Sequence, residues 1–154
     1  MADNSFLGEG MKFPPQIDPA TGRVLTSKRE QSVKESIYLI LMTRKTERLV
    51  RPNFGSVIES YAFMDTGYTV LNMMARELSE TILNQEPRVA DVDINIVPQL
   101  NEGRLILNID YLIAASNTRD NLVFPFYLDG GVEEETEEQF PVQEEFYEDD
   151  ESEE

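Results

Sequence analysis

The chain has 154 residues, no cysteine, no histidine and a formal net charge of −17. From Asp129 onward it holds 14 acidic residues and no Lys or Arg, whereas residues 1–128 hold 16 acids against all 13 bases. Missing cysteine excludes disulfides, and missing histidine removes the usual general base and metal ligand. No apolar run approaches the roughly 18 residues of a membrane span, and no basic block indicates nucleic acid. We therefore expect no metal, cofactor, membrane span or nucleic-acid partner.

The length predicts one domain, at residues 13–128. Residues 1–12 are polar and predict a flexible N-terminal arm, and residues 129–154 are too acidic to fold alone, which predicts a disordered tail. A turn signal at residues 18–22 predicts a small hook that joins Ile17 to Val24.

A first helix is predicted after Ser27, because Ser27 to Glu30 has the S-x-x-E form of a capping box. The apolar residues that follow share one stripe, and we expect them in the core: Val33, Ile37, Ile40 and Leu41. The opposite face carries Lys34, Glu35 and Ser36, and we expect it to face solvent.

A rigid elbow is predicted at Arg51, Pro52, Phe54 and Gly55, after a polar loop. We expect Phe54 to be buried, Gly55 to adopt an unusual φ, and Arg51 to hold backbone carbonyls. A second helix is then predicted from about Tyr68 to Gln85, with Asp65 or Thr66 as its cap. Its apolar face consists of Leu71, Met74, Leu78 and Ile82.

Glu86, Pro87 and Arg88 follow this helix directly. Pro87 disfavours helical geometry at Glu86 and has no N–H for the helical ladder, so the helix should end there. A carboxylate and a guanidinium then flank a rigid joint, and the planar fork of Arg88 suits a carboxylate or exposed carbonyls. Taken alone, these three residues are a helix stop with a local ion pair.

Three strands are predicted between Val89 and Leu128, because apolar residues alternate with polar ones through most of this region. Pro125 cannot donate to a ladder, which favours an edge position for the third strand. The sequence therefore predicts an α+β fold, with two main helices packed on one face of a small antiparallel sheet of three to four strands.

A family resemblance becomes visible when these motifs are taken in order. They are Phe13-Pro14-Pro15, Asp18 with Gly22-Arg23, Thr43-Arg44, Glu47-Arg48, Arg51-Pro52-x-Phe54-Gly55, Glu86-Pro87-Arg88 and Asn121 to Phe126. The chain resembles the baseplate wedge proteins of contractile phage tails, a family sometimes labelled lysozyme-like, with relatives in type VI secretion systems and extracellular injection particles. The resemblance covers residues 13–128.

The resemblance implies a structural protein, assembled in the cytoplasm, that becomes part of a phage tail or injection particle in six copies. It implies that the protein joins the baseplate wedge to the first sheath ring and nucleates sheath assembly. Glu86, Pro87 and Arg88 would face larger wedge subunits, and Arg88 would not be needed for folding. The sheath-facing strand would consist of Asn121, Leu122, Val123, Phe124, Pro125 and Phe126. Sheath protein, wedge subunits and inner tube or hub proteins are the implied partners.

The chain departs from the family pattern at two positions. Thr46 stands where a glycine often precedes the Glu-Arg pair, and Gln85 stands where an aromatic residue often precedes Glu-Pro-Arg. The acidic tail is also outside the pattern. We expect Gln85 to weaken the packing at the wedge contact.

Two other functions are compatible with the sequence. A lysozyme-like hydrolase would need two carboxyls that flank a cleft, and no pair of acids stands at a telling spacing in an apolar setting. An adaptor could recruit a basic partner through the acidic tail, with Phe140, Phe146 and Tyr147 as docking residues. We predict that the protein is not an enzyme.

The strand that would accept the sheath arm is a separate question. Pro125 limits the bonds that the edge of the third strand can make, so one of the other strands is an alternative acceptor.

Overall fold

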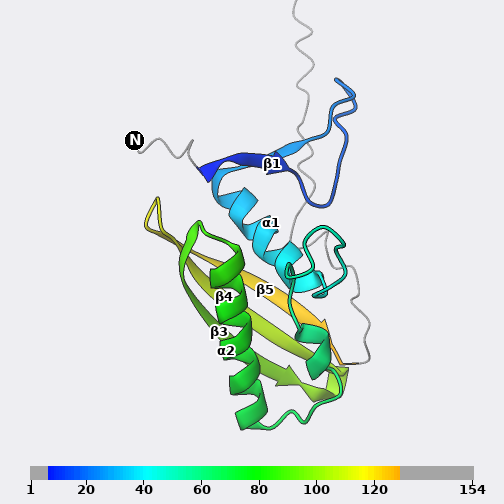
Figure 1. Cartoon of the computed structure of the whole chain (residues 1–154), viewed down its shortest axis with the longest axis vertical. Coiled ribbons are helices and arrows are strands. Elements are labelled where there is room, and N and C mark those ends of the chain that lie inside the picture. The colour runs from blue at the N-terminus through cyan, green and yellow to red at the C-terminus, as the bar shows by residue number, and fades with distance from the viewer. Residues whose placement is uncertain (1–6, 129–154) are drawn as a thin grey trace, which may run out of the picture.

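A computed structural model describes residues 7–128 of the chain, and these residues form one α+β unit (Figure 1). Strands β1 (Glu9–Met11) and β2 (Thr26–Lys28) form a small antiparallel pair that leads into helix α1 (Arg29–Met42). The 3₁₀ turn η2 (Ile58–Tyr61) precedes helix α2 (Tyr68–Gln85). The main sheet contains β3 (Val89–Gln99), β4 (Arg104–Ile113) and β5 (Thr118–Tyr127), with the short turn η3 (Leu100–Glu102) between β3 and β4. The predicted α+β fold is confirmed.

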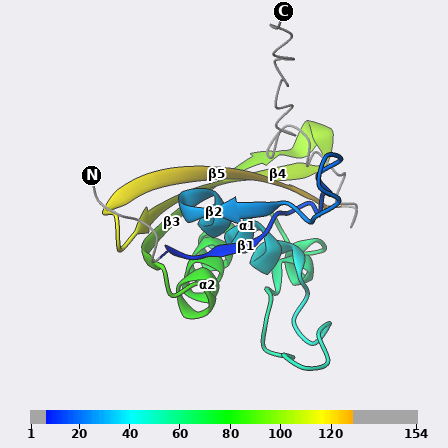
Figure 2. The same ribbon diagram turned by 90° about the horizontal axis from the view of Figure 1, so that it is seen from above.

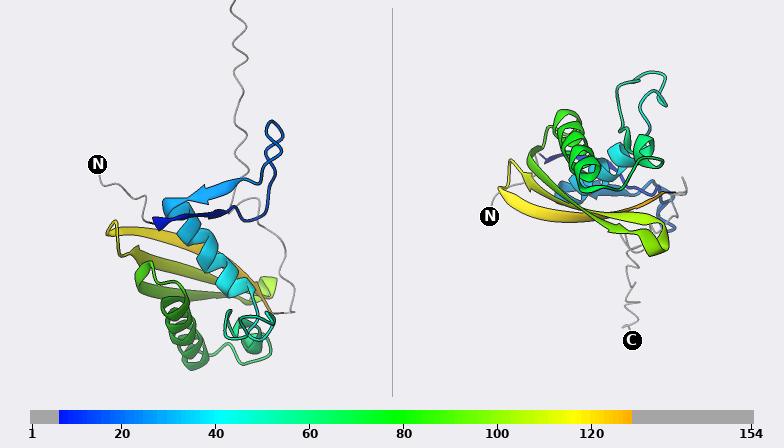
Figure 3. Two further views of the ribbon diagram at one scale, coloured as in Figure 1. Left: turned by 45° about the horizontal axis from the view of Figure 1, so that its top comes forward. Right: turned by 90° about the horizontal axis from the view of Figure 1, so that it is seen from below.

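The main sheet is antiparallel, with β4 between β3 and β5. Residue Ile109 at its centre lies opposite Ile94 of β3 and Leu122 of β5. Both helices lie on the same side of the sheet, and Figure 2 and Figure 3 show the other face uncovered by any helix. The predicted layer arrangement is therefore correct.

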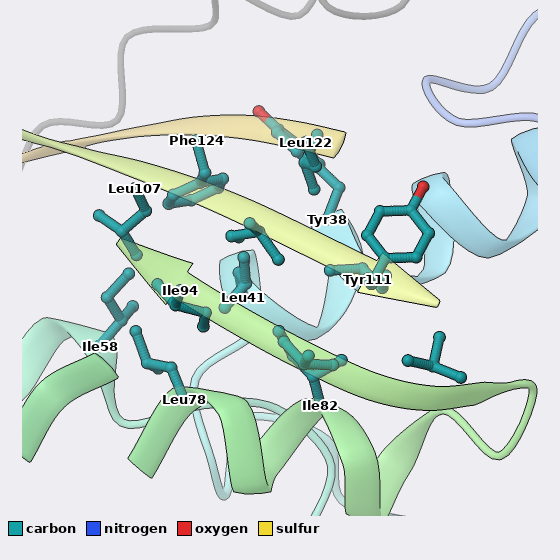
Figure 4. Packing of buried hydrophobic residues seen from close by; sticks show 14 of the residues in the cluster. Tyr38, Leu41, Ile58, Leu78, Ile82, Ile94, Leu107, Tyr111, Leu122 and Phe124 are labelled. Carbon is teal, nitrogen blue, oxygen red and sulfur yellow. The ribbon is translucent and has the colours of Figure 1, made fainter. Parts of the chain in front are cut away.

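The core lies between the sheet and the two helices (Figure 4). The strands alternate as their period of two requires, so every second residue of β4 from Leu105 to Ile113 is buried. Burying an aliphatic or aromatic side chain contributes about 1.5–3 kcal/mol, and this interface supplies most of the stabilising apolar contact. The fully buried members of α1 and α2 include the predicted residues Val33, Ile37, Ile40, Leu41, Met74, Leu78 and Ile82.

The predicted start of α1 is wrong in its mechanism. Ser27 is buried and pairs with Gly10 in the small sheet, so its hydroxyl does not cap the helix. Lys28 occupies the cap position and makes no side-chain capping bond. Likewise the cap position of α2 is occupied by Gly67, and by neither Asp65 nor Thr66, the two residues predicted to cap it. Packing of the apolar stripes therefore defines these helix starts more than local capping does.

Glu35 is buried, although the sequence places it on the polar face of α1. Its side chain accepts a hydrogen bond from the Phe13 backbone N–H at 3.1 Å and one from the Gln31 side-chain amide at 3.1 Å. The carboxylate thereby holds the segment before Pro14 against α1, and Phe13 packs on Tyr38 with ring centroids 5.6 Å apart.

The N-terminal part differs from the expected arm in the residues that the structure describes. Leu7 is buried in the core, and β1 pairs with β2. The hook is present, because Ile17 and Val24 form an antiparallel bridge. The predicted acidic tail lies outside the described residues, and the proposed domain limits stay predictions.

Glu35→Ala should lower the free energy of unfolding by about 1–3 kcal/mol, because the Phe13 N–H loses this buried acceptor. Glu35→Gln keeps one carbonyl oxygen in place, and the Gln31 amide can turn to meet the new amide, so it should cost less than half as much. Urea unfolding of both variants measures the difference. Equal losses would show that the hydrogen bond is not what stabilises this contact.

Candidate functional site

The end of α2 forms a sharp corner at Glu86, Pro87 and Arg88. Glu86 is the C-cap residue in extended geometry, with φ −115° and ψ 91°, and its N–H donates to the Ile82 carbonyl. Pro87 follows and cannot continue the helical ladder. The predicted helix end is therefore correct, and β3 begins at Val89.

Arg88 folds back on Glu86 with a two-pronged contact. Its Nε donates to Glu86 Oε1 at 2.7 Å and its Nη2 donates to Glu86 Oε2 at 2.8 Å. The remaining Nη1 donates to the Leu7 carbonyl at 2.9 Å and to the Ser32 hydroxyl at 3.2 Å. One guanidinium thus ties the N-terminal segment, α1 and the α2–β3 joint together. We name Glu86, Pro87 and Arg88 with these contacts the corner.

The pair is charged, as its geometry requires. Burial alone would raise the pKa of Glu86, but hydrogen bonds from Arg88 and Ser36 and the Arg88 charge together hold it below its ordinary 4.5. The hydrogen bonds with Glu86 raise the pKa of Arg88 against the opposing effect of burial. Both groups are therefore ionised at neutral pH and stabilise each other.

The corner is more internal than the sequence suggested. Glu86 is 3% exposed, and the side chain of Arg88 is 26% exposed. Pro87 and Asn84 are exposed beside them. Removing Arg88 would leave a buried carboxylate without its charged partner, which argues against the hypothesis that Arg88 is not needed for folding. Whether the corner faces a wedge subunit stays a prediction.

The elbow is held by Gln85, a residue whose role the sequence did not indicate. Its side-chain oxygen accepts from the Gly55 N–H at 2.8 Å, and its amide donates to the carbonyls of Gly55 at 2.8 Å and Asn53 at 3.3 Å. Gly55 has φ +111°, as expected, and a Cβ there would lie 2.3 Å from the Thr43 carbonyl oxygen. Gln85 therefore couples the elbow to the residue that precedes the corner.

The other two predictions for the elbow differ from the structure. Phe54 is half-buried, and the guanidinium of Arg48 lies 4.3 Å from its ring centroid. The guanidinium of Arg51 lies 6.0 Å from the centroid of the same ring. This contact stands in place of the predicted one with backbone carbonyls. Cations over an aromatic face, with backbone bonds from Gln85, stabilise this loop.

The predicted sheath-facing strand, residues 121–126, lies within β5 at an edge of the main sheet. The Leu128 N–H donates to the Gly103 carbonyl, so the even-numbered positions of β5 face β4. Asn121, Val123 and Pro125 then direct their main-chain groups to the open edge, while Leu122, Phe124 and Phe126 are buried in the core. The predicted edge position is confirmed. The corner leads into β3, so the structure places the two candidate sites on either side of β4.

The same alternation applies to the other edge. The Ala114 N–H donates to the Arg88 carbonyl, so the even-numbered positions of β4 face β3, and Pro98 of β3 faces outward. Each edge strand therefore carries one proline at a position where the ladder needs no donor. Beside β3, a crevice of about 280 Å³ is lined by Leu71, Ala75, Ile94 and Ile96, among others.

No three His, Cys, Asp or Glu side chains of residues 7–128 gather where they could hold a metal ion. In the same range, no helix is long and apolar enough to cross a bilayer.

A family model described as Baseplate wedge protein gp25 matches residues 27–118, which is more than half of the chain. The chain belongs to this family. The matched region runs from β2 to the start of β5 and contains both helices and the corner. The predicted resemblance is thereby confirmed.

Individual relatives agree with membership of the gp25 family. Baseplate wedge protein gp25 of Enterobacteria phage T4 is 26% identical over 83 residues, which are 54% of this chain and 63% of the T4 protein. The chain thus matches less than two thirds of that relative's length. A crystallised Geobacter sulfurreducens protein, provisionally described as a tail lysozyme, is 38% identical with a TM-score of 0.62 over 67% of this chain and 94% of its own.

Two assembled complexes contain a chain of the same fold. A chain of the anti-feeding prophage baseplate has 24% identity and a TM-score of 0.55, over 88% of this chain and 94% of its own. A chain of the type VI secretion system baseplate complex has 20% identity and a TM-score of 0.53, over 62% of this chain and 90% of its own.

Arg88→Ala should lower the free energy of unfolding by about 3 kcal/mol, because Glu86 would remain buried without its partner. The matched control is Arg119→Ala, which removes an exposed pair with Asp91 and should change stability by about 0.5 kcal/mol or less. Chemical denaturation of both variants tests this. A loss for Arg88→Ala no greater than that for Arg119→Ala would contradict the internal role of the corner.

The stability contribution of Glu86 should depend on acid pH with a defined sign. Its folded-state pKa is lowered, so the contribution is present above the ordinary value of 4.5 and is lost as the pH falls through the folded-state pKa. Wild type should therefore exceed Glu86→Gln in unfolding free energy at pH 7, and the difference should shrink below about pH 4.5. Parallel stability curves of the two proteins from pH 7 to pH 3 would refute this assignment.

Proposed function

We propose that this gp25 family member joins a baseplate wedge to the first sheath ring and nucleates sheath assembly by accepting an added strand. The observation that carries the proposal is the open edge of β5 on a small sheet. The protein would act through non-covalent contacts, in six copies per particle. Its partners would be the sheath protein and larger wedge subunits.

The edge of β5 supplies hydrogen-bonding groups in a fixed register. By the alternation described above, the N–H groups of Val123 and Tyr127 face outward, and Pro125 interrupts this row of donors. The outward N–H of Asn121 donates to Asp120 Oδ1 at 2.8 Å. An unpaired edge is a template for strand addition, in which main-chain bonds supply affinity and side-chain pockets supply specificity. An arriving strand would therefore form main-chain hydrogen bonds with the outward residues before and after Pro125. At Pro125 itself, β5 would offer no N–H donor to it.

The edge of β3 is the runner-up as acceptor. Its outward positions Val92, Ile94 and Ile96 carry side chains that point to the core side, next to the crevice beside α2. A strand added there could place apolar side chains into that crevice. The two edges thus make different demands on the arriving sequence, and substitutions at each can separate them.

The wedge contact is proposed at the exposed part of the corner. Pro87 and Asn84 are exposed, whereas Glu86 and most of Arg88 are occupied inside the domain. In this proposal the Glu86–Arg88 pair fixes the shape of the surface, and Pro87 and the exposed part of Arg88 touch the neighbour. Gln85 is engaged with the elbow, so it would not pack against the neighbour.

The hydrolase alternative has little support in the described residues. A glycosidase needs two carboxyl groups that flank the scissile bond in a cleft. The two buried carboxylates are both engaged in structural contacts, Glu86 with Arg88 and Glu35 with Phe13 and Gln31. The crevice beside β3 is lined by no Asp or Glu. Turnover of cell-wall polymer by the purified protein, abolished by one carboxylate substitution, would overturn the structural assignment.

Val123→Pro should reduce the yield of sheath-bearing baseplates at least tenfold, because it removes a central donor from the β5 edge. The ladder to β4 should survive, since position 123 faces outward as Pro125 does. Electron microscopy of particles assembled with the variant measures the yield. Thermal unfolding should confirm that the variant is folded.

Ile96→Pro is the matched control on the other edge, where position 96 also faces outward. It should leave the sheath yield within about twofold of wild type. The reverse pattern would identify β3 as the acceptor in place of β5. Normal sheath yield with both folded variants would refute strand addition altogether.

A further inference from the structure

The loop between α1 and η2 is a basic surface segment with a net charge of +3. We name residues 44–54 the basic loop. It contains Arg44, Lys45, Arg48 and Arg51 against the single acid Glu47. Figure 2 shows it extending away from the sheet and past the helices. Within residues 7–128, only Arg44 of these four bases forms an ion pair, with Glu59.

The basic loop is rigidly held although it projects from the domain. The Thr46 N–H donates to the Pro52 carbonyl at 2.7 Å, which closes the loop on itself. At its base, the Ser56 N–H donates to the Thr43 carbonyl at 2.8 Å. Gln85 binds the chain at Asn53 and at Gly55, next to the end of the loop. A loop so constrained presents its tip in one arrangement, which lowers the entropic cost of binding.

The tip carries two apolar side chains with nothing packed on them. Leu49 is 95% exposed and Val50 is 92% exposed. They stand between Arg48 and Arg51, whose guanidinium groups both lie over Phe54. An apolar tip framed by cations fits an acidic segment that also contains apolar or aromatic residues.

Such a segment exists in the same chain. Residues 133–154 contain 13 acids and no Lys or Arg, together with Phe140, Phe146 and Tyr147. Residues 23–29 also carry three bases and no acid, but the almost fully exposed Leu49 and Val50 distinguish the basic loop. Charge complementarity therefore selects the acidic segment among the parts of this chain that could cover the loop.

The fold also brings the two within reach. Phe126, near the end of β5, and Arg44, at the start of the basic loop, line the same crevice. Phe140 lies twelve positions beyond Leu128, and that length of chain can span up to roughly 40 Å when extended. A folded domain of about 100 residues has a radius of gyration of about 13 Å, so this reach exceeds its width. The acidic segment can thus meet the loop without leaving its own chain.

We propose that residues 133–154 dock on the basic loop of the same chain. The carboxylates neutralise Lys45, Arg48 and Arg51, and the aromatic residues cover Leu49 and Val50. This contact is separate from the strand edge, and it holds or fails independently of the proposed sheath role.

The absence of cysteine allows a direct test in the full-length chain. Ser152→Cys introduces a unique thiol for a nitroxide label, and ¹⁵N spectra report the broadening of each backbone amide. At 50 mM salt, the amides of residues 46–51 and 53 should lose at least half of their intensity relative to the reduced label. At 500 mM salt the loss should fall at least threefold, because screening weakens contacts between exposed charges.

Charge variants and a mixing experiment make the test decisive. Arg48→Glu with Arg51→Glu should abolish the broadening, whereas the matched exposed pair Arg23→Glu with Arg76→Glu should preserve it. A mixture of ¹⁵N-labelled chain without nitroxide and unlabelled chain with nitroxide should show no broadening. Broadening in that mixture would replace the intrachain contact with one between copies. No broadening of the loop in the labelled chain at low salt would refute the proposal.

Discussion

The ion pair between Glu86 and Arg88 is the interaction on which the arrangement of the domain depends. A buried carboxylate is costly unless it is paired and hydrogen-bonded, and Arg88 turns back on Glu86 to supply the charge and two of its hydrogen bonds. The donors left on Arg88 reach Leu7 and Ser32. A local pair at a helix stop therefore determines how the N-terminal segment and α1 sit against the start of β3. This long-range role explains the burial of the corner without excluding a neighbour at Pro87.

Gln85 extends the same arrangement in the opposite direction. It points to the elbow while Glu86 points to α1, so adjacent residues at the end of α2 fix two segments that are far apart in sequence. The elbow tolerates this only with glycine at position 55, where any side chain would meet the Thr43 carbonyl. Gln85 therefore supplies a hydrogen-bond network that holds the end of the basic loop against the residue before the corner.

Helices and strands whose buried side chains recur at a regular spacing could be predicted from the sequence. Contacts between residues far apart in the sequence could not. The buried stripes of α1, α2 and β4 follow directly from their spacing, and Pro125 predicted an edge strand. Glu35 could not be predicted as buried, because its main partner Phe13 lies 22 residues away. Ser27 failed as a cap because pairing with Gly10 drew it into a strand. The three residues of the corner were identified, but the partners of Arg88 at Leu7 and Ser32 were not.

The placement of the two edge prolines limits how readily the open edges of the main sheet pair with other strands. A flat edge with a full row of donors pairs with any exposed strand, including another copy. Pro98 and Pro125 each remove one donor from the outward row and leave the inner ladders intact. Under the proposed strand addition, an incoming strand would have to match this interrupted pattern of donors, which would disfavour indiscriminate pairing. The corner contributes to this selectivity, because a fixed start for β3 sets the register of the whole sheet and hence the positions of both gaps.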